Sequence, residues 1–480
     1  MAGIGFELKK IYKKDGISRT LTGALYSSIV TVGPTLIVVV TILLLYLFLG
    51  MSNVSVTQRE VLSSTILYVF IFSVILTAPF NSVFSRYLAD KFYVEEFEDI
   101  LPSYYTGILC TGGLSLLAAV PVMGSLYFRG GVDLPFILGA YVMWVSAVLI
   151  FFSVTYLHAT KDYKIIAIFF LIGMLLAGLL GWVLYFFGVC DEIHSILYGL
   201  AFGFFCIAFS EFSYIRRYFK GNGQNYTECL GYLRRHFPIF ATNLFYMIGL
   251  YVHNFVFWAT DMHLVVADTY YSHQAYDMAS CLAMFTNIST IVIFTVIAET
   301  RFHDTYQRYM ESVIGGTYKQ IQKNKKSMFR TLSQQMSQVF GVQLAITAVL
   351  FMLILIFGVQ MGFSGMILKI YPVLAAAYLG IFMMYCNIVY LYYFDDTVGS
   401  MLTGLIFLAA TFLGTLVSRG LAVEFFGLGA FFGMICGWTF SFFRIRWVER
   451  GFEGYVFCRY KIIETMKSSA KGKIVYRKGE

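Results

Sequence analysis

The sequence predicts an all-α polytopic membrane protein with twelve transmembrane helices arranged as two six-helix lobes. Three observations indicate this class. Of the 480 residues, 59% are hydrophobic and 13% are charged, whereas charged residues make up about 25% of a typical soluble domain. Twelve apolar runs are each long enough to cross a bilayer as a helix, which takes about 20 residues. Six runs precede a basic connector, residues 216–235, and six follow it.

Only a helix satisfies the backbone hydrogen bonds of such a run within lipid. The predicted spans are residues 24–50, 61–88, 102–128, 133–157, 164–188, 193–215, 236–260, 276–300, 334–358, 370–394, 398–418 and 421–447. The chain therefore divides into an N-terminal segment (1–22), an N-terminal lobe (23–215), the connector (216–235), a C-terminal lobe (236–447) and a basic tail (448–480). In the first segment Ile4, Leu8 and Ile11 share one helical face beside lysines, which predicts an amphipathic helix on the inner leaflet.

The basic residues predict the orientation. If the loops are assigned alternately to the two sides, one side holds 31 Lys and Arg and the other holds four. Because Lys and Arg are retained on the cytoplasmic side, both termini and the connector are expected in the cytoplasm, with the spans in the inner membrane. The formal net charge of +8 is then a topology signal, and no nucleic-acid partner is predicted. The lipid bilayer is the expected surroundings.

Composition indicates no cofactor and no metal. The eight cysteines fall singly, without a Cys-x-x-Cys pair, so they form neither a disulfide framework nor a zinc site and are expected to pack as small apolar groups. The longest outer connection, residues 261–275, contains His and Asp without metal-ligand spacing. No cleavable signal peptide is recognised, because the first apolar run is too long for one.

Catalytic constellations are not recognisable in this sequence. Ionisable residues inside spans are the first place to look for function in a membrane protein. Glu211, Glu299, Asp395 and Asp396 are expected at the cytoplasmic ends of their spans, and the first span contains no carboxylate. A cation-coupled exporter normally keeps an acid buried within a helix, and none is expected here.

Neutral polar and aromatic side chains are the better candidates for a substrate path. Tyr371, Tyr378, Tyr385 and Tyr392 recur every seven residues, so they form one stripe on a helix that drifts only about 20° per heptad. A tyrosine offers a flat apolar face and a hydroxyl, which suit sugar rings. The alternative interpretation is that these rings serve helix packing and the interfacial belts. The predicted substrate-path residues are Tyr371, Tyr378, Tyr385, Asn243, Tyr246, Asn254 and Asn287.

One charged residue lies at the end of the second span of each lobe, Arg86 in the first lobe and Glu299 in the second. Arg86 and Glu299 are predicted to make inward contacts between the lobes or with a cytoplasmic partner. The alternative is that they extend to lipid headgroups.

Several short motifs of the chain stand out: Met1-Ala2-Gly3-Ile4-Gly5-Phe6-Glu7-Leu8, Gly33-Pro34, Arg86-Tyr87-Leu88-Ala89-Asp90, Lys161-Asp162-Tyr163, and Glu299-Thr300 with Phe302 and Tyr306. Together they resemble the PelG family of exopolysaccharide exporters. The resemblance implies a flippase superfamily that includes drug exporters, whose fold places two six-helix lobes around a central cavity. It also implies an N-acetylhexosamine polymer as substrate, and as partners a cytoplasmic glycosyltransferase and membrane proteins of the Pel system.

The leading interpretation is a non-enzymatic polysaccharide exporter, and two alternatives stay open. A cation-coupled exporter of small amphiphiles would need the acid that the first span lacks. An integral-membrane glycosyltransferase would need a carboxylate or an Asp-rich motif that holds a nucleotide and a metal. Asp395-Asp396 is the candidate, and its connection is too short to build a donor site.

Overall fold

The computed structural model describes residues 17–51, 54–160, 162–221 and 223–454, and within them the side chains of 17–32, 163 and parts of 288–300 fall outside the description. Most of the predicted amphipathic segment and most of the basic tail therefore lie outside the described residues. The elements of the first half are α2 (Ile17–Phe48), α3 (Val56–Val94), the 3-10 turn η2 (Phe97–Asp99), α4 (Ile100–Phe128), α5 (Leu134–Thr160), α6 (Tyr163–Phe186) and α7 (Glu192–Tyr218).

The connector contributes α8 (Glu228–Arg235). The remaining elements are α9 (Phe237–Trp258), β1 (Leu264–Val266), β2 (Tyr270–Ser272), α10 (Gln274–Ile297), the π-helical turn η3 (Ala298–Phe302), α11 (His303–Gly315), α12 (Tyr318–Phe357), α13 (Gly365–Tyr393), α14 (Thr397–Ser418), the 3-10 turn η4 (Val423–Phe425) and α15 (Leu428–Arg450).

The multi-pass class is confirmed. Within the described residues, ten helices are long and apolar enough to cross a membrane, and each coincides with a predicted span. The two other predicted spans, 24–50 and 276–300, coincide with α2 and α10. The described part of α2 adds a shorter apolar helix, Gly33–Phe48.

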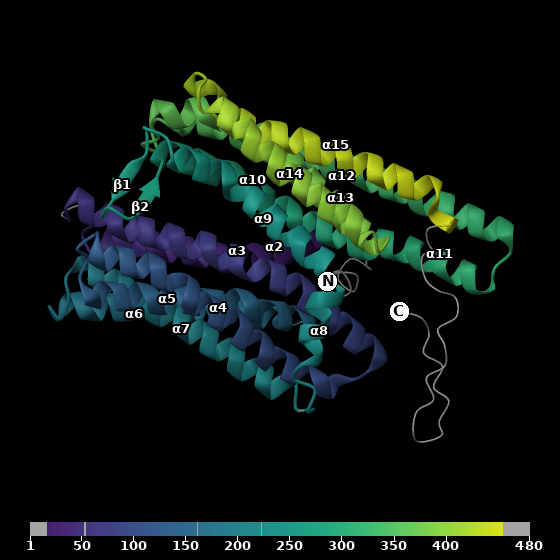
Figure 1. Cartoon of the computed structure of the whole chain (residues 1–480), viewed down its shortest axis with the longest axis horizontal. Coiled ribbons are helices and arrows are strands. Elements are labelled where there is room, and N and C mark those ends of the chain that lie inside the picture. Colours follow the sequence, from purple (N-terminus) through teal and green to yellow (C-terminus); the bar gives the residue numbers. More distant parts are fainter. Residues whose placement is uncertain (1–16, 52–53, 161, 222, 455–480) are drawn as a thin grey trace.

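The helices pack in two groups. In the N-terminal group, α2 to α7, the main contacts are α6 with α7, α5 with α7, α3 with α5, and α2 with α6. In the C-terminal group, α9 to α15, α14 packs on α9 and α15, and α13 packs on α10 and α15. The groups meet mainly where α3 lies along α9 and where α2 touches α10. Figure 1 shows the β1–β2 hairpin at one end of the molecule and α8 and α11 toward the other. We call these the hairpin end and the connector end.

Three regions differ from the sequence-based expectation. The loop expected at 300–333 is helical, because α12 extends 40 residues from a capping box in which Thr317 and Gln320 satisfy each other's backbone N–H groups. The connector contains the short helix α8. The fold is not purely α, because the outer connection 261–275 forms an antiparallel two-stranded hairpin that pairs Leu264 with Ser272.

Helices α14 and α15 approach closely through glycines spaced four residues apart. A Cβ added at Gly429 would lie 2.5 Å from the Cα of Thr415, and one at Gly433 would lie 2.8 Å from the Cα of Thr411. Small residues at this spacing let two membrane helices pack backbone to backbone. The glycines of α15 therefore set the distance between these two helices.

We expect Gly433→Leu to lower the free energy of unfolding by about 1–3 kcal/mol, because overpacking at a backbone contact forces the helices apart. Gly178→Leu in α6 is the matched control, since a Cβ there meets no atom within 4 Å. Thermal unfolding of the purified protein in detergent measures both. Equal melting temperatures for the two variants would contradict this role of Gly433.

Candidate functional site

At the hairpin end, four aromatic residues and one threonine join the two groups. We call these residues the hairpin seal: Thr65, Tyr68, Trp258, Tyr270 and Tyr271. The Tyr68 hydroxyl accepts from the Tyr271 N–H at 2.9 Å and donates to its carbonyl at 2.8 Å. The Tyr270 hydroxyl lies 3.1 Å from Thr65 Oγ1. The Tyr68 ring stacks on Trp258 with centroids 5.0 Å apart. The hairpin is thereby tied to α3.

The hairpin side chains belong to the hydrophobic core of the other group. Val266 and Tyr270, which pair with each other across the two strands, are 2% and 0% exposed and lie in the core cluster of the N-terminal group. The turn between the strands holds Ala267 and Asp268 at positive φ. It fits closely over Gly130 at the end of α4, where a Cβ would lie 2.5 Å from the Ala267 carbonyl oxygen. The two groups are therefore closely packed at this end.

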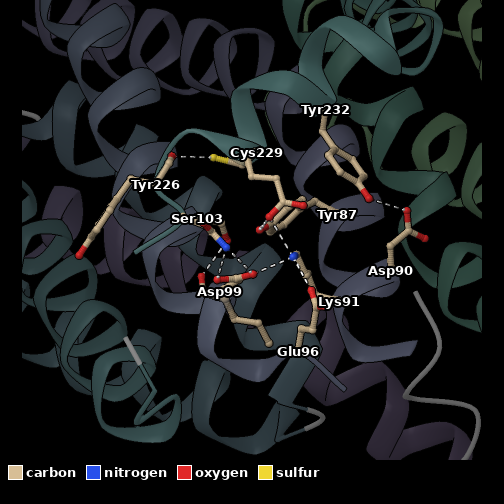
Figure 2. A network of polar contacts seen from close by, with 12 residues as sticks. Tyr87, Asp90, Lys91, Glu96, Asp99, Ser103, Tyr226, Cys229 and Tyr232 are labelled. Carbon is tan, nitrogen blue, oxygen red and sulfur yellow. Dashed lines mark hydrogen bonds and ion pairs between the residues drawn. The ribbon is translucent and has the colours of Figure 1, made fainter. Parts of the chain in front are cut away.

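At the connector end, a buried lysine holds three carboxylates from separate segments. Lys91 of α3 lies with its Nζ 2.7 Å from Glu96, 2.7 Å from Asp99 and 2.9 Å from Glu228 of α8. Figure 2 shows Lys91 and Asp99 pointing toward each other beneath the Tyr87 ring. We call Lys91, Glu96, Asp99 and Glu228 the connector clamp. Because the Lys91 ammonium contacts all three carboxylates at once, these contacts form only when α8 is docked beside the end of α3.

Further contacts fasten the connector to the same place. The Gly223 N–H donates to the Glu98 carbonyl at 2.8 Å, and Asn225 Nδ2 donates to Asp99 Oδ1 at 3.1 Å. The rings of Tyr87 and Tyr232 meet edge to face at 4.9 Å. Burial raises the pKa of the Cys229 thiol to about 11, so this cysteine is an unreactive packing group. The connector is therefore docked on the N-terminal group.

Arg86 lies where the connector meets both groups. The Arg86 guanidinium forms an ion pair with Asp90, one turn along α3, at 3.3 Å. Burial and then the neighbouring Arg86 guanidinium lower the pKa of His236, which links α8 to α9. Burial raises the pKa of Tyr306 in α11, and Arg86 partly offsets that rise. The side chain of Glu299 lies outside the described residues. The predicted contacts of both residues between lobes or with a partner stay predictions.

The C-terminal group contains a buried polar network that the structure assembles from α9, α10 and α13. Asp277 accepts from Asn254 Nδ2 at 2.7 Å, from Trp258 Nε1 at 2.9 Å and from the His273 N–H at 3.0 Å. The Tyr378 hydroxyl lies 3.1 Å from Ser280 Oγ. This network brings together three predicted substrate-path residues, Asn254, Asn287 and Tyr378.

Asn287 extends the network toward α12. Its Nδ2 donates to the Tyr378 carbonyl at 3.1 Å, and its Oδ1 accepts from Gln343 Nε2 at 2.7 Å. Tyr378 is 1% exposed and Asn287 is 9% exposed. In this conformation these side chains hold α10 against α9, α12 and α13, and their contact with substrate stays a prediction.

A second set of predicted residues forms a partly exposed aromatic face on α9 and α13. The rings of Tyr246 and Tyr385 lie 5.8 Å apart. Asn243 Nδ2 donates to the Tyr392 hydroxyl at 3.1 Å, and Tyr392 also packs against the core of the N-terminal group. We call Asn243, Tyr246, Tyr385 and Tyr392 the aromatic face. Tyr371 stands apart, fully buried, with its ring stacked on Phe351 of α12.

Asp396, weighed above as an enzymatic carboxylate, is fully buried and structural. Its Oδ2 accepts from Arg444 Nε of α15 at 2.5 Å, and its Oδ1 caps the Gly399 N–H of α14 at 3.0 Å. A carboxylate so engaged stabilises a helix N-terminus and an interhelical ion pair.

The structure corrects the position that the sequence predicted for Glu211. It was expected at the end of its span, but it is fully buried in α7, seven residues before the last residue, Tyr218. Neither of its carboxylate oxygens has a hydrogen-bond partner among the described residues. The expectation that no span contains a buried acid is therefore wrong. Only the packing of α7 against its neighbours reveals this, because the residues after Glu211 are partly apolar and partly basic.

The fold is similar to those of several solved membrane transporters. The chain is similar to a eukaryotic MATE transporter, AtDTX14, with 12% identity, a TM-score of 0.59, and 94% of this chain and 98% of that one covered. It is also similar to a Vibrio cholerae MATE transporter, VcmN, with 11% identity, a TM-score of 0.58, and 94% and 99% covered. A third is an outward-facing multidrug resistance MATE transporter of the MOP superfamily, with 12% identity, a TM-score of 0.56, and 89% and 96% covered.

At these identities the likeness shows the fold alone, which is the fold of those multi-pass membrane transporters. The particular family follows from the sequence itself. The family model described as "PelG: Putative exopolysaccharide Exporter (EPS-E)" matches residues 1–457. The chain belongs to the PelG family of exopolysaccharide exporters. No curated protein matches it closely enough to count as a relative.

Proposed function

We propose that this protein exports a Pel-like polymer of N-acetylhexosamines from the cytoplasm across the inner membrane. The match to the exopolysaccharide exporter family over residues 1–457 is the observation that supports this most directly. The enzymatic alternative named Asp395-Asp396 as its candidate, and the Asp396 side chain forms an ion pair with Arg444.

The proposal includes the topology. With α2 and α10 added to the ten candidate spans, the chain crosses the membrane twelve times, in two six-helix lobes around a central path. The basic residues gather at the connector end, which we place in the cytoplasm together with both termini. The hairpin seal then lies on the outer side and separates the path from the exterior in this conformation.

We propose that the aromatic face lines the path. Its tyrosines are partly exposed and lie on α9 and α13, beside the N-terminal group. Tyr378, Asn254 and Asn287 would support the face from behind, since their polar atoms are already bonded to one another and to Asp277 and Ser280. The connector end would receive polymer from a cytoplasmic glycosyltransferase and membrane partners of the Pel system.

Deleting the gene for this chain is expected to abolish polymer in the medium while the cytoplasmic glycosyltransferase stays active. Secreted polymer is measured with a hexosamine-binding lectin, and re-expression of the chain is the control. Normal secretion without the chain, together with increased sensitivity to cationic drugs, would contradict polysaccharide export and support small-molecule export.

Removing two of the three rings of the aromatic face, Tyr246→Ala with Tyr385→Ala, is expected to lower secretion per membrane-inserted molecule by about tenfold. Each aromatic contact contributes about 0.5–1.5 kcal/mol, and the double Phe variant keeps the flat faces and should secrete near the wild-type level. Tyr371→Ala, a buried ring outside the face, is the comparison and should change abundance rather than secretion per molecule. Equal secretion by the double Ala and wild-type proteins would remove the face from the path.

A further inference from the structure

The most unusual buried group in the N-terminal group is Glu211. Its side chain is 0% exposed, and both carboxylate oxygens lack a hydrogen-bond partner within the described part of the chain. The other acid of α7, Glu192, begins the helix and is partly exposed. A buried polar group without a partner is rare, because it loses its bonds to water and gains none in exchange.

Burial decides the state of this carboxyl. An ionised carboxylate that is out of water and unpaired is far more costly than the proton needed to neutralise it at neutral pH, so Glu211 holds a proton in this conformation. If water or a cation reached it in another conformation, the same carboxyl would release that proton. The group is thus suited to bind and release one proton per conformational cycle.

The titratable groups around Glu211 come from several helices. Tyr104 of α4 lies beside this part of α7, with its ring 6.0 Å from that of Phe212, the residue after Glu211. Tyr156 of α5 follows, its ring 4.8 Å from that of Tyr104. On α6, which packs along α7, the described titratable side chains are Lys164 and Tyr185, one residue from either end of the helix. No charged side chain of the described residues bonds to the Glu211 carboxyl.

Hydroxyl groups lead from Glu211 toward the connector clamp. The Tyr104 hydroxyl lies 2.8 Å from Ser153 Oγ, and the Tyr156 hydroxyl lies 3.0 Å from Ser103 Oγ. Tyr87 of α3 lies at the connector end. The Tyr87 hydroxyl is 3.5 Å from Glu228 Oε2, a carboxylate of the clamp. These hydroxyls lie between the buried acid and the partly exposed carboxylates of the connector end, and their hydrogen bonds run to Ser153, Ser103 and Glu228.

We propose that Glu211 is a proton-binding site whose protonation and release are coupled to export, with the hydroxyls of Tyr104, Tyr156 and Tyr87 linking it to the connector end. The coupling to export rests on the proposed function, whereas the proton-binding site does not. The proton binds to a Glu211 oxygen and leaves along the hydroxyl groups, so no bond other than O–H is made or broken. Coupling to a proton gradient would give the exporter a source of energy.

The first test measures the proton directly. Infrared difference spectra of the purified protein in lipid nanodiscs, recorded as the pH is raised, report the stretching band of a protonated carboxyl. We expect a band in the wild type that Glu211→Gln lacks and that disappears reversibly at higher pH. Glu192→Gln, the same change on the same helix, should retain it. A wild type without that band, or a band that persists at every pH where the protein stays folded, would overturn the proton site.

The second test measures transport. Glu211→Gln imitates the protonated side chain in size and polarity, so the fold should persist while release becomes impossible. We expect secretion per membrane-inserted molecule to fall by about tenfold or more, as for ionisable residues of proton relays within membranes. Glu211→Asp, which still titrates, should recover part of it. Wild-type secretion by Glu211→Gln would overturn the coupling.

The two tests separate the inference from the proposed function. If the wild-type chain secretes no polymer, the export proposal fails, and the titrating band of Glu211 still decides whether the site binds a proton. If the wild type secretes and Glu211→Gln secretes equally, export stands and the coupling fails. A lower abundance of Glu211→Gln would be separated from a transport defect by its melting temperature.

Discussion

Replacing Lys91 with methionine is expected to lower the free energy of unfolding by about 3–5 kcal/mol, as for other buried charges that lose their partner. The side chain of Lys91 is 7% exposed and that of its partner Asp99 is 11% exposed, so Asp99 would be left ionised and poorly solvated. Glu96 and Glu228 are about half-exposed and lose less, because water and salt screen them. Methionine keeps the apolar stem, which isolates the charge as the cause.

The measurement is a chemical unfolding titration in detergent, together with protease cleavage of the connector between α7 and α8. Lys220→Met, at an exposed position of the same connector, is the control and should be neutral. Lys91→Met combined with Asp99→Asn should recover much of the loss, since it removes both buried charges. A stable and protease-resistant Lys91→Met protein would show that the connector is held by its other contacts.

Tyr270→Ala is expected to open the hairpin seal and to lower stability by about 3–5 kcal/mol, the usual loss when a buried aromatic ring is truncated. The ring is 0% exposed, contacts Tyr68 at 4.6 Å and lies 3.1 Å through its hydroxyl from Thr65. Tyr271→Ala is the matched control on the same strand. That ring is 43% exposed, and the backbone bonds of Tyr271 to Tyr68 remain in the variant.

Accessibility of the seal is measured with a cysteine at Val266, a residue that is 2% exposed in the hairpin, in a chain whose own cysteines are replaced. A membrane-impermeant maleimide should label it more than about tenfold faster in Tyr270→Ala, since each 1.4 kcal/mol changes an opening equilibrium tenfold. Tyr271→Ala should label at the parent rate. Equal rates in all three proteins would mean that the hairpin does not close the outer side.

The tyrosines of α13 show what a seven-residue spacing can predict and what it cannot. It predicts one face for Tyr371, Tyr378, Tyr385 and Tyr392, and three of these rings do meet α9 and α10. Tyr371 instead packs on α12. The seven-residue spacing specifies a side of the helix, whereas the neighbouring helices determine whether a tyrosine there is closed in a polar network, as Tyr378 is, or partly open, as Tyr385 is.

The sequence by itself determined the membrane class, the place of ten spans and the family, because hydropathy and short motifs are properties of contiguous residues. The division into two six-helix lobes stays a prediction from the connector that interrupts the apolar runs. Tertiary structure alone decided the hairpin seal, the connector clamp and the burial of Glu211. These features depend on partners far apart in the chain. Thr65 and Tyr270 are separated by 205 positions, and the four helices α4 to α7 lie between Lys91 and Glu228 in the sequence. An acid two turns inside a helix is exposed or buried according to what packs beside it, and no local pattern records that.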